Sequence, residues 1–419
     1  MLQRLKLEIW KSIHRLPSGL IHLWQLCLLQ RLVKHAYENT GLYHNLWDKH
    51  GVKPSRLKRL SDLEHFPVVD KKVFLAAPIE SYIGLTQLQF FVWRSTSGTS
   101  GEPFQFISIN NPHSSYYHFM TYRFLYWQGL TQDKINRLSR VKIPIATSEI
   151  DTYPYLQIRL SRFLTQKEQT VKRILALCPY IIETFPSVLV ELSRSMDASP
   201  SFKKRSVRFA ISYGEHLTLS QRQYIENTLG CEVYNRYGTE EFYVIATECQ
   251  HHDGLHLNAE SFILEIVDNH GFSVPSGKTG RVIITDLRNY VMPFIRYDTG
   301  DQGFFLHESC SCGLAGKTFI ITGRIGEFLS INKKRIHHLE IDKIMKNYSG
   351  IIIQYQMVKV DEKTVALFII PGSSVTDTDI ELIRKNMQVL IGAGCRLDIK
   401  FVTEIKRTPW GKCQTLVNL

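Results

Sequence analysis

The sequence predicts an α/β protein with a large N-terminal part and a small C-terminal α+β part. In the middle of the chain, strand-like runs at 207–213 and 231–235 flank a helical run at 219–229. Such alternation is typical of parallel strands joined by crossover helices. Past residue 255 the pattern changes to successive strands, and after residue 324 a mixed pattern of short strands and helices begins. We therefore expect a domain boundary near residue 325.

The other elements are predicted in chain order. Residues 1–75 are mainly helical, and apolar residues within 2–32 recur at the spacing of an amphipathic helix. The rest of the N-terminal part is predicted to contain a strand at 90–94, helices at 112–125 and 171–177, and strands at 256–257, 262–267 and 281–286. The C-terminal part is predicted to contain strands at 328–331, 351–358, 364–370 and 398–402 and helices at 339–346 and 376–390.

The composition is that of a globular protein with room for more than one domain. The chain has 419 residues, of which 44% are hydrophobic and 21% charged, and a domain usually holds about 100–200 residues. The 51 Lys and Arg exceed the 39 Asp and Glu by 12, a balance that favours polyanionic partners such as nucleotides, CoA or an acyl-carrier protein. The basic residues are spread along the chain without a nucleic-acid-binding motif, so we expect no nucleic-acid partner.

Charged residues interrupt the first apolar stretch, so the N-terminus lacks the layout of a signal peptide. The most apolar segment, residues 20–29, is shorter than the roughly 20 residues that a membrane-spanning helix needs. We expect the amphipathic N-terminal helix to pack against the body of the protein, with a membrane surface as the alternative. We also expect a cytoplasmic location, which argues against a disulfide framework for the eight cysteines.

A hydroxyl- and glycine-rich loop at 95–103 is the most distinctive segment. Its backbone N–H groups and hydroxyls can surround phosphate oxygens, because no bulky side chain stands in the way. It is not the Gly-x4-Gly-Lys-Ser/Thr loop of the P-loop NTPases. The loop residues that we assign to phosphate are Ser95, Thr96, Ser97, Gly98, Thr99, Ser100 and Gly101.

Further motifs follow this loop in a fixed order. Tyr213-Gly214-Glu215 and Tyr237-Gly238-Thr239-Glu240 each come after a strand-like run, and open α/β folds bind ligands in loops at the carboxyl ends of strands. The carboxylate of Asp301 can accept hydrogen bonds from both hydroxyls of a ribose. Lys412 closes the motif Pro409-Trp410-Gly411-Lys412, and a lysine cation can stabilise negative charge that builds on oxygen in a transition state.

In their order these motifs resemble the adenylate-forming (acyl-CoA synthetase) superfamily, whose members activate a carboxylate with ATP. The segment 38–72 also resembles the leader of phenylacetate-CoA ligases and the related CapK-type proteins, and the resemblance runs from about residue 35 to Lys412. It implies a large multi-sheet N-terminal adenylation domain, residues 1–324, that binds ATP, the acid and zinc. It also implies a small mobile α+β lid domain, residues 325–419, that carries the catalytic lysine.

The resemblance implies a role for each motif residue. Thr239 contacts the α-phosphate, Glu240 holds Mg²⁺ and Lys412 is the mobile cation, so these three form the catalytic set. The implied ATP-binding residues are those of the 95–101 loop together with Gly214, Glu215, Tyr237, Gly238, Asp301 and Arg324. The chain departs from the usual family pattern at three positions, which are Glu102 in place of Lys, Asp298 in place of Arg and Gly326 in place of the hinge Asp.

The implied reaction is ATP-dependent activation of a small-molecule carboxylic acid through an acyl-adenylate, followed by transfer to a thiol, that of CoA. Two alternatives stay open. The acyl group could pass to an amine or a carrier protein, or the chain could be a non-catalytic nucleotide-binding relative, which Glu102 and Gly326 motivate. The acid is open between aryl and aliphatic, with aryl slightly favoured, and the sequence is compatible with a homodimer.

Two closely spaced pairs of soft ligands predict a metal site that is independent of ATP. Cys249 and His252 form a Cys-x2-His pair, and Cys310 and Cys312 form a Cys-x-Cys pair. Four such ligands suit a structural, four-coordinate Zn²⁺, and relatives of phenylacetate-CoA ligase carry similar pairs. Buried thiols beside a surface histidine run are the alternative without metal. His252 is chosen by spacing, and the alternates are His251 and His256.

Overall fold

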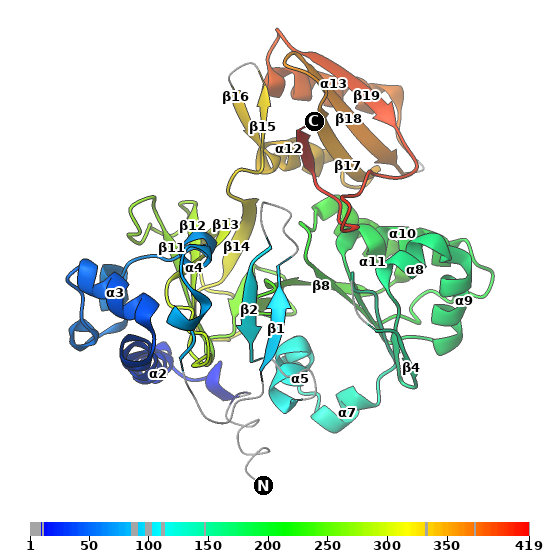
Figure 1. The fold of residues 1–419 in the computed structure, drawn as a ribbon. Helices are drawn as coiled ribbons and strands as arrows, with labels where there is room; N and C mark the ends of the chain where they lie inside the picture. Colours follow the sequence, from blue (N-terminus) through cyan, green and yellow to red (C-terminus); the bar gives the residue numbers. More distant parts are fainter. Residues whose placement is uncertain are drawn as a thin grey trace. The chain divides into compact units, whose positions relative to one another are not determined.

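Figure 1 shows the computed structural model as a ribbon coloured from the N-terminus to the C-terminus. The chain divides into two compact units, each built from two segments: the first unit holds residues 1–135 and 236–325, and the second holds 136–235 and 326–419. The structure describes residues 10, 12–84, 91–96, 103–109, 114–145, 148–331, 334–372 and 374–418. One unit boundary falls between Ile325 and Gly326. The division into an adenylation domain, 1–324, and a mobile lid, 325–419, stays a prediction.

Helices open the first unit. They are α2 (Ser18–Asn39), α3 (Gly41–Lys49), α4 (Lys71–Leu75) and the 3-10 turns η1 (Pro54–Arg56), η2 (Leu60–His65) and η3 (Ile79–Ser81). The buried side chains of α2 form one stripe, as in an amphipathic helix: Ile21, Gln25, Leu29, Leu32, Val33 and Ala36. The prediction of one helix over 2–32 is wrong at Pro17, which precedes α2, because proline lacks an N–H and disrupts a helix interior.

A two-stranded hairpin follows, formed by β1 (Val92–Ser95) and β2 (Gln105–Ser108). Three helices come next: α5 (Ser115–Thr121), α6 (Arg123–Trp127) and α7 (Gln132–Asn136). The strands of the first unit pair antiparallel in the order β11-β12-β13-β14-β10-β9. Their bounds are β9 (Ala246–Glu248), β10 (Leu255–Leu257), β11 (Phe262–Val267), β12 (Gly280–Asp286), β13 (Tyr297–Phe305) and β14 (Phe319–Arg324).

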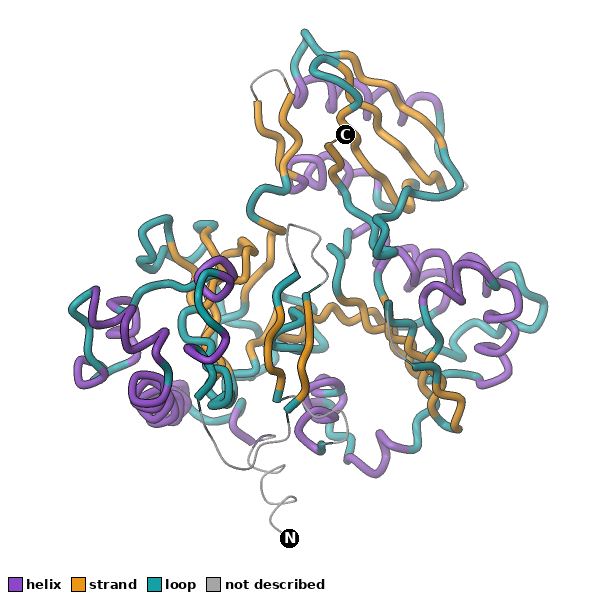
Figure 2. The backbone as a smooth tube through the Cα atoms, viewed as in Figure 1, coloured by secondary structure: helices purple, strands orange, loops and turns teal. Residues whose placement is uncertain are grey.

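The first segment of the second unit alternates strands and helices along the chain (Figure 2), which confirms the predicted α/β class. The strands β5 (Tyr155–Gln157), β3 (Arg140–Lys142), β6 (Ile181–Thr184) and β7 (Phe209–Tyr213) pair in parallel in this order. An antiparallel strand, β4 (Ile150–Thr152), pairs with β5. The helices are α8 (Leu160–Thr165), α9 (Lys167–Leu177), α10 (Pro186–Asp197) and α11 (Leu219–Leu229).

Strand β8 (Glu232–Tyr237) neighbours β7, and its last two residues, which belong to the first unit, pair with β9. The preceding helix α11 has the predicted bounds because its ends carry strong signals. Thr218 and Gln221 form a capping box at its start. Gly230 ends it in the left-handed conformation that glycine adopts most readily.

The second segment of the second unit is a small α+β structure. Its hairpin, β15 (Phe328–Ile331) and β16 (Lys334–His337), leads into α12 (His338–Met345) and η4 (Lys346–Tyr348). A sheet in the order β19-β18-β17-β20 carries α13 (Asp377–Ile391) between its strands in sequence. The strands are β17 (Ile352–Lys359), β18 (Thr364–Pro371), β19 (Arg396–Phe401) and β20 (Leu416–Asn418). Among the helices that the structure describes, none has the length and apolarity needed to cross a bilayer.

A buried charged cluster lies in the first unit. The guanidinium of Arg123 forms an ion pair with the carboxylate of Glu260, and both side chains are at most 1% exposed. His14 Nε2 lies 2.9 Å from Glu260 Oε2, and the Tyr116 hydroxyl donates to Oε1 over 3.0 Å. Burial alone raises the pKa of Glu260, but Arg123 and His14 more than offset it and hold that pKa below its ordinary value. The cluster therefore fixes the N-terminal segment and α6 against the residues before β11.

Replacing Glu260 with Gln is expected to lower the free energy of unfolding by about 3–5 kcal/mol, because Arg123 is left buried without its counter-charge. Urea denaturation of the two proteins measures the difference. The matched control is Glu38→Gln, which removes a surface carboxylate 3.8 Å from Lys34 and should change the free energy by less than about 1 kcal/mol. A loss below about 1 kcal/mol in Glu260→Gln would mean that the cluster is not a stabilising constraint.

Candidate active site

The hairpin of β1 and β2 holds the start of the predicted phosphate loop. Ser95 ends β1 opposite Gln105. The Thr96 N–H donates to the Phe104 carbonyl over 3.0 Å, and the Phe104 N–H donates to Thr96 Oγ1, also over 3.0 Å. The remaining predicted phosphate ligands, Ser97, Gly98, Thr99, Ser100 and Gly101, lie outside the described residues, as does Glu102. The structure therefore locates this loop through Ser95 and Thr96 alone.

In the second unit, the loop after β7 places Gly214 and Glu215. Gly214 has φ +74°, and a Cβ at this position would lie 2.7 Å from the ring of Phe185, so the turn requires glycine. The Glu215 carboxylate accepts from the Ser187 N–H over 3.1 Å and from the Ser187 hydroxyl over 3.0 Å. Since Ser187 lies in the first turn of α10, the carboxylate occupies the electropositive end of that helix.

The same carboxylate holds the segment that carries Lys412. The Cys413 N–H donates to Glu215 Oε1 over 2.7 Å. Burial holds the pKa of Glu215 above its ordinary value, and the N–H groups of Cys413 and Ser187 and the charge of Arg407 offset only part of that rise. Arg407 also donates to the Ser187 hydroxyl over 2.8 Å and to Glu191 over 2.9 Å. The start of α10, the loop after β7 and the C-terminal segment therefore meet at the carboxylate of Glu215.

Lys412 lies beside Gly214 as a result. Its Nζ is 3.8 Å from the position that a Cβ on Gly214 would take and 5.7 Å from the centroid of the Phe185 ring. The backbone before it is a tight turn, in which the Thr408 N–H donates to the Lys412 carbonyl over 2.7 Å and Gly411 has φ +80°. Three predicted site residues, Gly214, Glu215 and Lys412, are thus brought together within the second unit.

A second group of predicted site residues lies in the first unit. Asp301 on β13 is opposite Arg324 at the end of β14, and Arg324 Nε lies 3.4 Å from Asp301 Oδ1. The Tyr237 hydroxyl donates to Asp301 Oδ2 over 2.6 Å. Burial and the charge of Asp301 raise the pKa of Tyr237 well above its ordinary value, so the phenol stays a donor. A phenol and a guanidinium therefore orient the carboxylate that the sequence assigns to ribose.

The loop after Tyr237 is a close turn. A Cβ on Gly238 would lie 1.7 Å from the Tyr243 carbonyl oxygen, so this position also requires glycine. The carbonyl of Thr239 accepts from the Tyr243 N–H over 2.8 Å, and the side chain of Glu240 is exposed. The contacts of Thr239 and Glu240 with phosphate and Mg²⁺ stay predictions.

The predicted metal ligands form a cluster in the first unit, with one change. Ligand atoms of Cys249, His256, Cys310 and Cys312 all lie within 4.8 Å of one another. The Sγ atoms of Cys249 and Cys310 are 3.5 Å apart, and Cys312 Sγ is 3.5 Å from His256 Nε2. Zn–S bonds of about 2.3 Å at tetrahedral angles put two sulfurs about 3.8 Å apart, so this donor set fits Zn²⁺.

The geometry favours the alternate His256 as the fourth member of the cluster, and the choice of His252 as a metal ligand stays a prediction. His252 Nδ1 lies 2.9 Å from Glu248 Oε2 instead. The antiparallel pairing of β9 and β10, with Leu255 opposite Glu248, brings His256 back to the cysteines. Burial lowers the pKa of His256 to about 4, so its ring is the neutral form that binds metals. Sequence spacing could not show a contact that depends on strand register.

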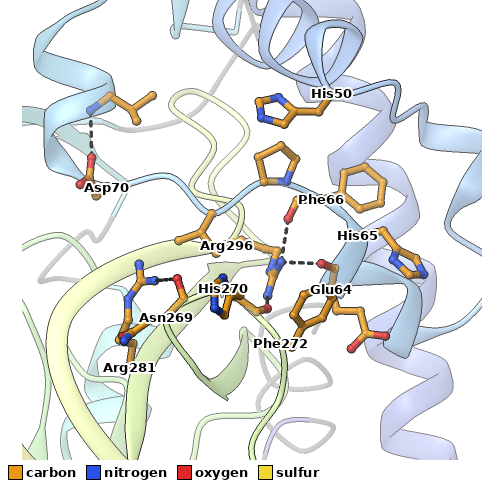
Figure 3. A pocket seen from close by; sticks show the side chains of 14 residues that line it. His50, Glu64, His65, Phe66, Asp70, Asn269, His270, Phe272, Arg281 and Arg296 are labelled. Carbon is orange, nitrogen blue, oxygen red and sulfur yellow. Dashed lines mark hydrogen bonds between the residues drawn. The ribbon is translucent and has the colours of Figure 1, made fainter.

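A cavity of about 500 Å³ in the first unit lies apart from these groups (Figure 3). One of its two arginines, Arg296, belongs to the 292–301 motif, and the guanidinium of this residue is hydrogen-bonded within the fold. It donates to the carbonyls of Glu64 over 2.8 Å, Phe66 over 2.7 Å and Gly271 over 2.6 Å and pairs with Glu265. None of the predicted site residues lines the cavity, so we do not assign it to catalysis.

The sequence interpretation missed the residues that hold Lys412 in place. Ser187 donates a hydrogen bond to Glu215, and Arg407 donates one to Ser187. Neither residue belongs to any of the motifs. One signal was available for Ser187, since Pro186 marks the first turn of a helix. The pairing of either residue with Glu215 is tertiary and leaves no sequence pattern.

Comparison with known proteins identifies the fold and a set of similar proteins. Residues 328–419 match the CapK C-terminal domain family. A structure of 2-hydroxyisobutyryl-CoA ligase in complex with R3-HIB-AMP superposes with a TM-score of 0.77 at 19% identity, covering 97% of this chain and 91% of that one. An anthranilate CoA ligase in complex with anthranoyl-AMP gives 0.53 at 17% identity, covering 82% and 68%. The fold is therefore that of the adenylate-forming CoA ligases.

Similar curated proteins include two phenylacetate-coenzyme A ligases. The one from Thermus thermophilus is 25% identical over 371 residues, which cover 84% of this chain and 81% of that protein. The one from Escherichia coli is 25% identical over 350 residues, covering 78% and 77%. Together with the C-terminal match, these relatives show that the chain is similar to phenylacetate-CoA ligases and to CapK-type proteins.

Replacing Glu215 with Ala is expected to release the 405–413 segment from α10, because the Ser187 and Cys413 N–H groups lose their acceptor. Losing charge-assisted hydrogen bonds costs about 1.5–3 kcal/mol, so local opening should be roughly tenfold to a hundredfold more populated. Limited trypsin digestion, with cleavage after Lys406, Arg407 and Lys412 followed by mass spectrometry, measures this. The control is Glu404→Ala, an exposed carboxylate just before this segment whose 3.4 Å contact with Lys167 lies at the surface and is worth less than about 1 kcal/mol. Equal cleavage rates in the two variants would contradict the anchoring role.

Proposed function

We propose that this chain is an AMP-forming acid–thiol ligase, which activates a carboxylic acid with ATP and transfers the acyl group to CoA. The observation that carries the proposal is the position of Lys412. This lysine ends the Pro-x-Gly-Lys motif and is held by Glu215 and Cys413 beside Gly214, at the carboxyl end of a parallel strand where α/β folds bind ligands. The relatives in the phenylacetate-CoA ligase branch support the same chemistry.

The first half-reaction forms the adenylate. A carboxylate oxygen attacks the α-phosphorus of ATP, the bond to the pyrophosphate oxygen breaks, and acyl-AMP and pyrophosphate result. Negative charge builds on the phosphate oxygens, and the Lys412 cation would stabilise it more in the transition state than in the ground state. The 95–101 loop and Thr239 would bind phosphate oxygens. Mg²⁺, held by Glu240, would neutralise phosphate charge.

Binding of the nucleoside part is assigned to the other motif residues. Asp301, oriented by Tyr237 and Arg324, would accept hydrogen bonds from the ribose hydroxyls. Gly214 and Glu215 would line the adenine site through the loop after β7. In the second half-reaction the thiol sulfur of CoA attacks the acyl carbon, the bond to the AMP oxygen breaks, the thiol proton leaves, and a thioester forms.

The Cys/His cluster is assigned to a structural Zn²⁺ held by Cys249, His256, Cys310 and Cys312. Four protein ligands fill a tetrahedral zinc, so the ion would serve the fold rather than the reaction. Phenylacetate-like aryl acids are our first choice of substrate, in line with the relatives. A cytoplasmic location, a homodimer and a carrier-protein or amine acceptor stay predictions.

The activity is tested by pyrophosphate release with MgATP across aryl, aliphatic and amino acids, with and without CoA. Release that depends on one acid, together with a CoA thioester seen by mass spectrometry, is the expected result. Release without a thioester, when CoA is present, would overturn the assignment of CoA and favour an amine or carrier protein. Binding of ATP without release for any acid would overturn the enzyme proposal.

Replacing Lys412 with Ala is expected to lower acid-dependent pyrophosphate release about 10²–10³-fold, the usual loss for one charge-stabilising donor. ATP affinity, measured by calorimetry, should change only a few-fold, because the lysine acts mainly in the transition state. The control is Lys406→Ala, an exposed lysine of the same segment, which should keep full activity. Equal activity of the two variants would remove Lys412 from the mechanism.

Replacing His256 with Ala is expected to lower the zinc content by more than half an equivalent relative to the unchanged protein, because only three ligands of the cluster remain. His252→Ala is the matched control and should keep the zinc, since that ring faces Glu248. Elemental analysis and thermal unfolding of both variants measure the effect. Loss of zinc in His252→Ala with retention in His256→Ala would reverse the assignment of the fourth ligand.

A further inference from the structure

A second cluster of metal-binding side chains lies in the second unit, apart from the cysteines. His216 follows Gly214 and Glu215 in the loop between β7 and α11, while His338 and Asp342 lie on α12. His338 and Asp342 are four residues apart, so they share one face of the helix. One ring nitrogen of each histidine and one oxygen of Asp342 all lie within 4.8 Å of one another.

The imidazole of His338 has one ring nitrogen without a hydrogen-bond partner among the described residues. His338 is 3% exposed, and its Nε2 has no hydrogen-bond partner among the residues that the structure describes. Burying a polar group without a partner costs about 1–3 kcal/mol, so such a nitrogen in a native protein calls for a ligand. Burial and the neighbouring His216 lower the pKa of His338 to about 3, which leaves the ring neutral near pH 7.

The third member supplies a negative charge. Asp342 Oδ2 lies 2.7 Å from His216 Nε2, and Oδ1 accepts from the Tyr355 hydroxyl. Burial alone would raise the pKa of Asp342. The hydrogen bonds from His216 and Tyr355 more than offset this effect, so the pKa of Asp342 lies below its ordinary value. The Tyr355 hydrogen bond would orient the carboxylate from behind, as outer-shell groups do for metal-bound carboxylates.

We propose that His216, His338 and Asp342 form a second metal site, for a borderline divalent cation of the Zn²⁺, Co²⁺ or Ni²⁺ class. Two imidazoles and one carboxylate are a ligand set that such ions favour over Mg²⁺ and Ca²⁺, which prefer all-oxygen sites. On binding, the hydrogen bond between His216 and Asp342 is replaced by two bonds to the ion, and the lone pair of His338 gains a partner.

Three protein ligands leave the fourth position of a tetrahedral ion to water. The loop after β7 also borders a small cavity of about 10 Å³, lined by His216 and Tyr355 but by neither His338 nor Asp342. The ion would join the loop after β7 to α12 and so hold together the two segments of the second unit. The site differs from the Cys/His cluster by having no sulfur ligand, and the proposal does not depend on the ligase activity.

The test uses the full-length protein with its Cys/His cluster already loaded with Zn²⁺, titrated with ZnCl₂ by calorimetry and, in parallel, with CoCl₂ by absorption spectroscopy. We expect one further equivalent to bind with micromolar or tighter affinity and to raise the midpoint of thermal unfolding by several degrees. The Co²⁺ bound in this step should lack the sulfur-to-metal charge-transfer band that a cysteine site gives. No further equivalent, or one that shows this band, would overturn the proposal.

Two variants separate ligation from folding. His338→Ala and His216→Ala should each lower the affinity of the further equivalent at least tenfold, while keeping the zinc of the cysteine cluster. The matched control is His44→Ala. His44 and Asp48 form a surface histidine–carboxylate pair at 3.7 Å without a second histidine, so the second equivalent should be unchanged. Persistence of that equivalent in both His338→Ala and His216→Ala, with native circular dichroism, would place the metal elsewhere.

Discussion

The second unit depends on one carboxylate, that of Glu215. It accepts hydrogen bonds from Ser187 at the start of α10 and from Cys413 beside the candidate catalytic lysine. A carboxylate suits this position because its two oxygens offer several acceptor sites to N–H and O–H donors at once. The loop after β7, the helix after β6 and the C-terminal segment are therefore positioned by a single residue, and the side chain of Lys412 takes its place beside Gly214 as a consequence.

Two residues of one motif have separate tasks in the first unit. Arg296 is almost fully buried, and its guanidinium holds three backbone carbonyls and Glu265. Asp301, five residues later, accepts a hydrogen bond from Tyr237 and pairs with Arg324. Asp298, between these two residues, forms an ion pair with Arg281 at 2.6 Å. The carboxylate at this position of β13 therefore has a counter-charge on the neighbouring strand β12.

Sequence reasoning succeeded where local signals decide structure and failed where neighbours do. The capping box at Thr218 and the left-handed Gly230 fix both ends of α11. Strand β13 was not predicted, because its two glycines and two aspartates have low strand propensity, and the pairing with β12 and β14 imposes the extended form. For the candidate site, the motifs named Glu215 and Lys412, which the structure brings together. They could not indicate the contact of Ser187 with Glu215 or the approach of His256 to the cysteines, which depend on tertiary packing and strand register.

Two features of the first unit that look separate share one side chain. The ring of Trp127 lies 5.7 Å from that of His14, in the buried charged cluster, and 5.6 Å from that of His256, in the Cys/His cluster. Trp127 also packs against the buried apolar cluster formed by Cys249, Cys310 and Leu314. Groups in contact through a shared neighbour do not contribute additively to stability. A metal at the cysteines would hold His256 and, through Trp127, limit the motion of His14 and Arg123, so the charged cluster and the metal cluster are best understood as one stabilising assembly.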